Sequence, residues 1–135
     1  MTAHQSLSTQ AYQHIGYLFY AVAAVDKTID DKEVKTLKGL VKEHWVNIDS
    51  TSDVFGSDAA YQIEIVFDWL EEADWKSDTC FSKFEGYYKN HSSLFTEDIK
   101  SLIIKTALAI AESYAGKNKS ELIILAKIEA LLKTK

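Results

Sequence analysis

The stretch from Tyr17 to Val41 decides how the chain folds, and its sequence is YLFYAVAAVDKTIDDKEVKTLKGLV. An apolar run ends on an acid, a short turn follows, and an amphipathic run begins with further acids. A weaker copy, IKTALAIAESYAGKNKSELIILAKIE, extends from Ile104 to Glu129. Apolar residues recur every three or four positions in both copies, so each copy predicts two helices joined by a turn. The chain is therefore expected to contain two related helical hairpins.

Acidic residues hold equivalent places in the two copies. Asp26 and Glu112 each close an apolar run, and they align without a gap. After the turn the second copy has two extra residues, which aligns Glu33 with Glu121. The two hairpins are thus related through their charges as well as through their apolar residues.

The rest of the chain is also expected to be helical. It has 135 residues, no Pro and five Gly, so polar clusters must provide the breaks between helices. Helix starts are expected at Ser6 or Ser8, Asp30, Ser57, Ser77 or Asp78, Thr96, and Asn118 or Ser120. The predicted fold class is all-α, a single-domain bundle of about six helices spanning residues 1–135.

Two of these helices carry specific expectations about burial. The first is apolar almost all round, which is typical of a central helix, and the second is expected to pack back on it. The helix that starts at Ser57 should bury Ile63 and Phe67. We expect Ile65, Val66 and Trp69 to avoid water as well. This leaves one clearly solvent-exposed stripe on that helix, made of Glu64, Asp68, Glu71 and Glu72.

Charge limits the choice of partner. The net charge is −5 and every cation is Lys, so nucleic acid is disfavoured and the bidentate fork of Arg is absent. Residues 1–98 carry a net −9 and residues 99–135 a net +4. This split can orient a charged partner or guide self-association, although a solvated acidic face explains it more simply.

The length of the apolar runs and the number of cysteines indicate the compartment and whether the chain crosses a membrane. The longest uncharged apolar run, Ile15 to Val25, has 11 residues, whereas a membrane span needs about 20. The first 25 residues contain no Lys or Arg, unlike a secretory signal peptide. The single cysteine, Cys80, cannot form an internal disulfide. We therefore expect a cytoplasmic protein without a membrane span.

The hydrophobic Ala-rich helix, Asp26, the short turn with Ile29, and the acids that open the next helix resemble the TerB-like domain of tellurite-resistance and related bacterial proteins. The resemblance covers Tyr17 to Trp45 well and Ile99 to Leu132 loosely. It implies an all-helical domain with a duplicated hairpin, a role in tellurite or stress response, and acidic turns that hold a divalent metal. Lys27 departs from the family pattern, which has Gly at that position.

The predicted metal ligands are Asp26, Asp30, Glu33, Glu112 and Glu121. Asp30 and Glu33 lie at an expected helix start, where the helix dipole favours acids without any functional reason. Asp26 and Glu112 lie at expected helix C-termini, where an acid is unfavourable by ~0.3–1 kcal/mol and suggests a compensating lysine or metal. Carboxylate ligands suit Ca²⁺, Mg²⁺ or Mn²⁺.

No enzymatic arrangement is found in the sequence. None of the four His residues follows a Glu by three positions, so the Glu-x-x-His motif of di-iron bundles is absent. Cys80 lies in an aromatic helical stripe, which predicts a buried thiol and not a nucleophile. The leading hypothesis is a non-enzymatic domain with a divalent-cation site. The alternative is a metal-free protein-interaction module that uses the acidic helical face.

Overall fold

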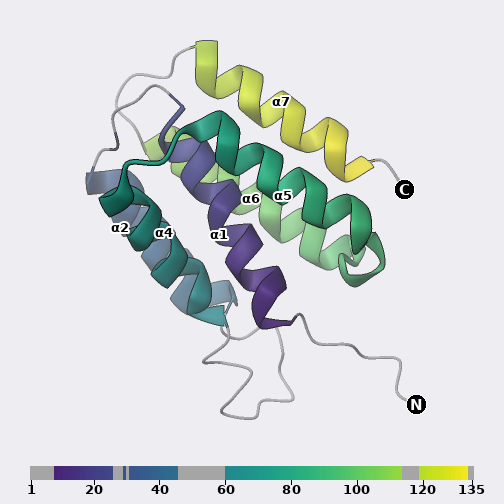
Figure 1. Cartoon of the computed structure of the whole chain (residues 1–135). Coiled ribbons are helices and arrows are strands. Elements are labelled where there is room, and N and C mark those ends of the chain that lie inside the picture. The colour runs from purple at the N-terminus through teal and green to yellow at the C-terminus, as the bar shows by residue number, and fades with distance from the viewer. Residues whose placement is uncertain (1–7, 26–28, 30, 46–59, 114–118, 134–135) are drawn as a thin grey trace.

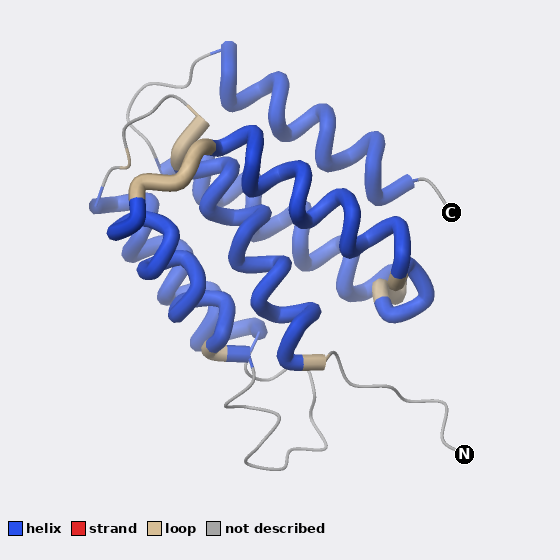
Figure 2. Tube along the Cα trace, in the orientation of Figure 1, coloured by secondary structure: helices blue, strands red, loops and turns tan. Residues whose placement is uncertain are grey.

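The computed structural model describes residues 8–25, 29, 31–45, 60–113 and 119–133. These residues form helices and turns and contain no strand, so the predicted all-α fold is confirmed (Figure 1, Figure 2). The six α-helices are α1 (Thr9–Ala23), α2 (Asp31–Leu40), α4 (Gln62–Ala73), α5 (Ser77–Asn90), α6 (Glu97–Ser113) and α7 (Lys119–Lys133). A π-helical turn, η1 (Val41–Trp45), extends α2, and a 3-10 turn, η2 (Ser92–Leu94), precedes α6.

Helix α1 lies at the centre of the bundle, as its sequence predicts (Figure 1). It packs most extensively on α4 and α5, and it also contacts α6 and α7. Every residue from Leu18 to Ala23 is buried. Ser8 begins the helix, because its hydroxyl accepts a hydrogen bond from the Ala11 amide at 3.1 Å. Of the described helices, none combines the length and the apolar character needed to cross a bilayer.

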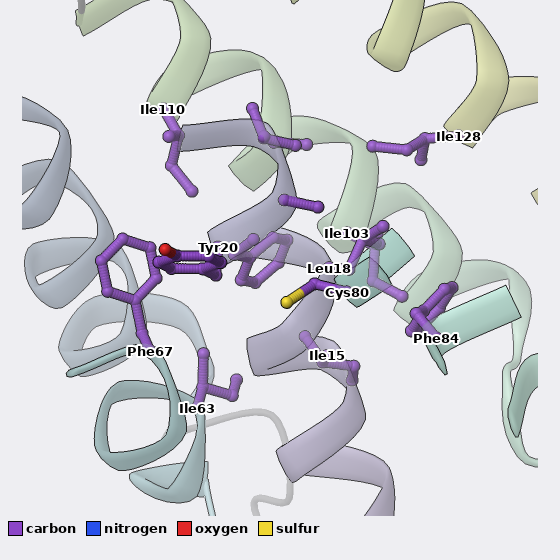
Figure 3. Close-up of a cluster of buried hydrophobic side chains, with 14 of the residues drawn as sticks. Ile15, Leu18, Tyr20, Ile63, Phe67, Cys80, Phe84, Ile103, Ile110 and Ile128 are labelled. Carbon is purple, nitrogen blue, oxygen red and sulfur yellow. The ribbon is translucent and has the colours of Figure 1, made fainter. Parts of the chain in front are cut away.

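The core is one continuous cluster of buried side chains around α1 (Figure 3). Ile63, Phe67 and Leu70 of α4 are buried in it, as the spacing of apolar residues in that helix predicts. From α5, the thiol of Cys80 is fully buried beside α1, which confirms that it is an internal group. Burial of this apolar surface from several helices provides the main stabilisation of the fold.

Helix α2 packs mainly on α6, whereas the sequence led us to expect direct packing on α1. The link to α1 is made one turn later, by Trp45 at the end of η1. Its indole ring meets Tyr12 and Phe19 edge-on, with ring centroids 6.5 and 5.9 Å apart. Its Nε1–H donates to the Thr106 hydroxyl at 3.1 Å, so the buried polar groups of both side chains are satisfied. Among the described residues, this large side chain provides the main contact between the two arms of the hairpin.

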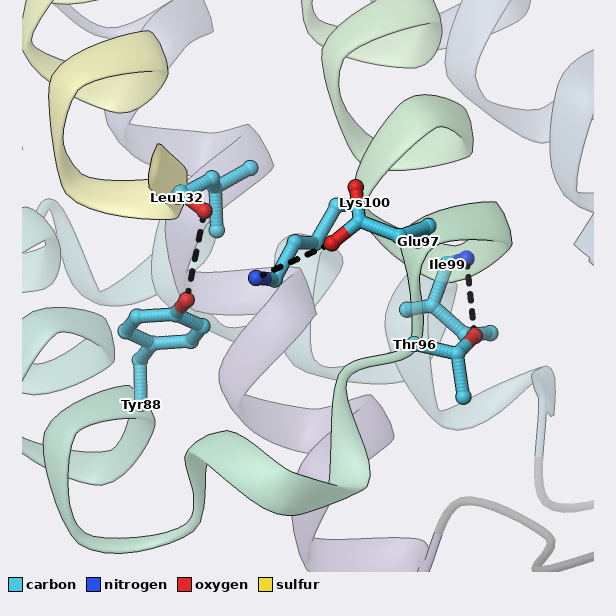
Figure 4. A network of polar contacts seen from close by, with 6 residues as sticks. All are labelled: Tyr88, Thr96, Glu97, Ile99, Lys100 and Leu132. Atoms are coloured by element: carbon cyan, nitrogen blue, oxygen red, sulfur yellow. Dashed lines mark hydrogen bonds and ion pairs between the residues drawn. The ribbon is translucent and has the colours of Figure 1, made fainter. Parts of the chain in front are cut away.

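Polar contacts fix the corner where α5 turns into α6 (Figure 4). The Ile99 amide donates to the Thr96 hydroxyl at 3.2 Å, which confirms Thr96 as the predicted start of α6. The Tyr88 hydroxyl donates to the Leu132 carbonyl at 3.4 Å and ties α5 to the last turn of α7. Lys100 lies 3.6 Å from the Glu97 carboxylate and 5.8 Å from the Tyr88 ring centroid. The predicted cap Ser57 lies outside the described residues.

Helices α1 and α4 approach each other closely at Gly16. A Cβ at this position would lie 2.9 Å from the Ile63 carbonyl oxygen and 3.2 Å from Cβ of Val66. Real Cβ atoms do not come so close to backbone oxygen, so a side chain here would force the two helices apart. Gly86, on the exposed side of α5, has no such neighbour within 4 Å.

We predict opposite effects of alanine at these two glycines. Gly16→Ala should lower the free energy of unfolding by about 1–3 kcal/mol, because the added methyl overpacks the contact between α1 and α4. Gly86→Ala should raise it by about 0.5–1 kcal/mol, because alanine has the higher helix propensity and meets open space. Urea unfolding of both variants measures the two effects. A stabilising Gly16→Ala would show that α1 and α4 are not in this close contact.

Candidate functional site

The structure places three of the five predicted metal ligands. Glu33 lies in the first turn of α2, and Glu121 lies in the first turn of α7. Glu112 is the last residue but one of α6 and is exposed. Asp26 and Asp30 lie outside the described residues. The prediction that acids stand at these helix ends is therefore confirmed for Glu33, Glu112 and Glu121.

Glu33 and Glu121 share an unusual property, because they are only 0% and 1% exposed. They occupy equivalent positions in the two hairpins, and among the described residues only Thr106 is also both polar and buried. A buried carboxylate costs several kcal/mol unless hydrogen bonds or opposite charge compensate it. The spacings Asp30-x-x-Glu33 and Asn118-x-x-Glu121 are those of helix capping boxes, which compensate a glutamate by bonding it to backbone amides.

The fold brings the starts of α2 and α7 to one end of the bundle, where α1 and α6 end (Figure 1). The described residues there do not form a metal centre on their own. In the part of the chain that the structure describes, no three His, Cys, Asp or Glu side chains group closely enough to hold an ion. A cation shell at this end would have to include residues beyond those described, such as Asp26 and Asp30.

A second candidate site lies on α4. Ile65, Asp68, Trp69 and Glu72 recur at helical spacing on its outer face, and we call these four residues the α4 patch. Ile65 is 56% exposed and Trp69 is 51% exposed. The expectation that both avoid water was wrong, because Ile63, Phe67 and Leu70 already fill the side of α4 that faces α1.

The side chains that surround the α4 patch on α4 itself are acidic, and lysines of α2 and α5 lie nearby. Glu64 and Glu71 flank the patch on α4, which carries no cation of its own. Lys38 of α2 lies 3.3 Å from the Asp68 carboxylate. Partial burial raises the pKa of the Glu64 carboxyl, an effect that Lys38 opposes. The patch therefore combines two exposed apolar side chains with excess negative charge toward the C-terminal end of α4.

A third feature is a groove of about 1330 Å³ between α5 and α7. Its walls include Phe81 and Glu85 of α5 and Ile123 of α7, and Tyr20 and the C-terminal end of α1 line its inner end. The Lys127 ammonium lies 5.6 Å from the Phe81 ring centroid. Side chains of both charges line the groove, and its described lining contains neither His nor Cys. The groove has the size for binding a ligand, but it offers no nucleophile paired with an imidazole.

A continuous series of rings follows α1 between α4 and α5. The Tyr87 ring is stacked between His14 and His91, at centroid distances of 4.2 and 4.1 Å. From His14 the series continues to Tyr17, Trp75 and Trp69, with successive centroids 5.3, 6.1 and 5.4 Å apart. The exposed ring of Trp69 is therefore supported from behind by the side chains that fill this surface.

Burial and nearby charges affect the ionisation of His14. Its Nδ1 lies 2.8 Å from the Gln10 carbonyl oxygen, so Nδ1 carries the proton in the neutral ring. Burial lowers the pKa of His14 below its ordinary value of 6.5, the hydrogen bond to the Gln10 carbonyl opposes this shift, and the charges of Lys83 and His91 add to it. His14 is therefore a group that folding keeps neutral.

This pKa predicts how stability depends on pH. As the pH falls below about 6.5, the unfolded chain takes up a proton at His14 before the folded chain does, so stability is lost until the pH passes the lowered pKa. His14→Gln should remove this contribution. The difference in unfolding free energy between wild type and variant should rise with pH through that window and be flat at higher pH. A difference that does not change between about pH 5 and 8 would contradict the assignment.

Burial and charge account for Cys80 as well. Burial raises the pKa of its thiol to about 11, so the thiol is protonated and inaccessible at neutral pH. The described part of the chain thus places its cysteine in the core and not in a site.

Comparison with known proteins adds no family to these observations. No protein-family model, no curated protein and no solved structure matches the chain. The resemblance to TerB-like domains therefore rests on the residues of the Tyr17–Val41 stretch and its copy alone.

Proposed function

We propose that this chain is a non-enzymatic protein-interaction module and that the α4 patch binds a cationic segment of its partner. The observation that carries this proposal is the exposure of Trp69 and Ile65 amid carboxylates. Apolar side chains rimmed by charged ones are typical of protein-binding surfaces, and Trp is strongly enriched at the residues that dominate binding energy. The patch lies on a rigid helix, so binding does not require the surface to be ordered first.

The charge of α4 indicates the chemistry of the partner. Lys38 neutralises Asp68 in part, and Glu72, three residues after Trp69 on the same face of the helix, is an exposed carboxylate. A Lys or Arg side chain of the partner can pair with these carboxylates and lie against the indole face of Trp69. An amphipathic segment with apolar and cationic residues on one side satisfies both parts of the patch.

We predict that a synthetic amphipathic helix of Leu and Lys binds the protein through Trp69. Trp69→Ser should weaken binding by about thirtyfold, which corresponds to about 2 kcal/mol for the loss of a central aromatic contact. Isothermal titration calorimetry measures the affinity. The substituted side chain is half exposed, so the melting temperature should change little.

Two controls make this test specific. Leu108→Ser removes an exposed apolar side chain from α6, outside the patch, and should leave the affinity unchanged. A peptide with Glu in place of each Lys should not bind, because it would meet the carboxylates of α4 with like charge. Equal binding to wild type and Trp69→Ser would rule out the α4 patch as the binding surface.

A second candidate function is that of the TerB-like domains, namely divalent-cation binding at the acidic turns in a protein of tellurite or stress response. The observation that favours it is the burial of Glu33 and Glu121 at equivalent helix starts. A cation held by these carboxylates together with Asp26, Asp30 and Glu112 would add to the interactions that Glu33, Glu112 and Glu121 already make within the chain. Ca²⁺, Mg²⁺ and Mn²⁺ are the ions that such oxygen ligands suit.

Melting curves test the cation proposal. Saturating Ca²⁺, Mg²⁺ or Mn²⁺ should raise the melting temperature, since an ion at one hundred times its dissociation constant stabilises the folded state by about 2.7 kcal/mol. Glu33→Gln and Glu121→Gln should each abolish this response. Glu129→Gln, a change at an exposed position of α7, serves as the matched control and should keep it. Wild-type melting curves that no metal shifts would leave capping as the role of both glutamates.

A further inference from the structure

Among the residues that the structure describes, four of the five exposed large apolar side chains fall into two groups, one on α4 and one on α7. Ile65 and Trp69 lie on α4, and Leu122 and Ile123 lie on α7, where they are 57% and 52% exposed. Figure 1 shows α1 and α5 between α4 and α7, and only the C-terminal end of α4 at Glu71 shares the lining of the groove with Ile123 of α7. A fifth exposed side chain, Leu108 of α6, belongs to neither group.

The exposed face of α7 has the opposite charge to that of α4. Lys119, Leu122, Ile123 and Ala126 recur at helical spacing on this face, and we call these four residues the α7 patch. Lys127 follows one position later. Apart from buried Glu121, the described part of α7 has one acid, Glu129, against Lys119, Lys127 and Lys133. The α7 patch therefore has the composition that the α4 patch requires of a partner.

The spacing of the two patches also matches. Ile65, Asp68, Trp69 and Glu72 repeat the intervals of Lys119, Leu122, Ile123 and Ala126. If α4 and α7 of two copies lie antiparallel with Trp69 against Leu122, Ile65 faces the small side chain of Ala126 and Glu72 faces Lys119. The carboxylates in the last turn of α4 then meet the N-terminus of α7, where the helix dipole favours negative charge. Three of the four facing pairs match in this register, and Asp68, which already pairs with Lys38, faces Ile123.

We infer that the α7 patch of a second copy of this chain docks on the α4 patch. The inference rests on the proposed function of the α4 patch and names its partner. The two patches of one copy are held apart by α1 and α5, so the contact forms between molecules. It is heterologous, because two different patches meet, and a joined pair still presents one unused α4 patch on one copy and one unused α7 patch on the other. Copies therefore add head to tail, and the contact weakens as salt screens the charges.

Complementary variants test this arrangement by analytical ultracentrifugation. The wild type should show a mass that rises with protein concentration and falls with added salt. Ile65→Ser with Trp69→Ser disables the α4 patch, and Lys119→Glu with Leu122→Ser disables the α7 patch. Each double variant alone should be monomeric. Their equimolar mixture should form a dimer and nothing larger, because each copy keeps one intact patch of the opposite kind. Leu108→Ser should behave as the wild type does.

A charge exchange provides a second test that leaves the apolar side chains in place. Glu72→Lys and Lys119→Glu should each reduce self-association. Mixing the two single variants should restore self-association, because the two reversed charges then face each other across the contact. Circular dichroism melting of every variant establishes that it is folded before its mass is interpreted.

Three results would overturn the inference: a wild type that stays monomeric at all concentrations, a double variant that still associates alone, or a mixture of double variants that stays monomeric. The peptide-binding experiment tests the proposed function separately. If the wild type is monomeric but the Leu and Lys peptide still binds in a manner that depends on Trp69, the α4 patch binds a different protein. If the peptide does not bind either, the proposed function fails as well.

Discussion

The structure depends on the burial of α1 on all sides. Helix α1 supplies the apolar surface on which α4, α5 and α6 pack, and it can do so because Leu18 to Ala23 offer no polar side chain in any direction apart from the Tyr20 hydroxyl. That hydroxyl donates to the Trp75 carbonyl at 2.8 Å and is therefore satisfied. A helix of this kind is stable only when it is surrounded, so the other helices are needed to cover it, and each of them keeps one face for water. The candidate sites all lie on those outer faces or at the helix ends.

Much of the fold could be predicted from the sequence, because helix starts and apolar periodicity are local properties. Ser8, Thr96 and the burial of Ile63 and Phe67 belong to this class. The packing of α2 on α6 could not be predicted, because the π-helical turn and the reach of Trp45 depend on partners far away in sequence. The predicted burial of Trp69 was wrong for a related reason. Hydrophobicity alone does not tell how many apolar residues a helix can bury once its neighbours are in place.

For the predicted metal site, the positions of the acids followed from the sequence and their environments did not. Helical spacing places Glu33 and Glu121 in first turns, and the internal repeat makes them equivalent. Their burial arises only when the bundle closes around both helix starts, whereas Glu112, at the end of α6, stays in water. The groove between α5 and α7 could not be predicted either, because it is formed by two helices that the sequence does not relate to each other.

The separation of charge along the chain becomes a separation in space. Acids concentrate in the middle of the sequence and lysines near its end, and the fold puts α1 and α5 between α4 and α7 (Figure 1). Such an arrangement gives the molecule an electrical polarity, and molecules of this kind orient one another before they touch.

The three tryptophans occupy three different environments, and this has a practical consequence. Trp45 is enclosed by other rings in the core, Trp69 is half in water, and Trp75 lies between Trp69 and Tyr17. Indole emission shifts to longer wavelength when the ring is exposed to solvent. Trp45 should therefore emit at a shorter wavelength than Trp69. The wavelength of the natural fluorescence therefore separates events in the interior from events on the outer surface of α4, without any added dye.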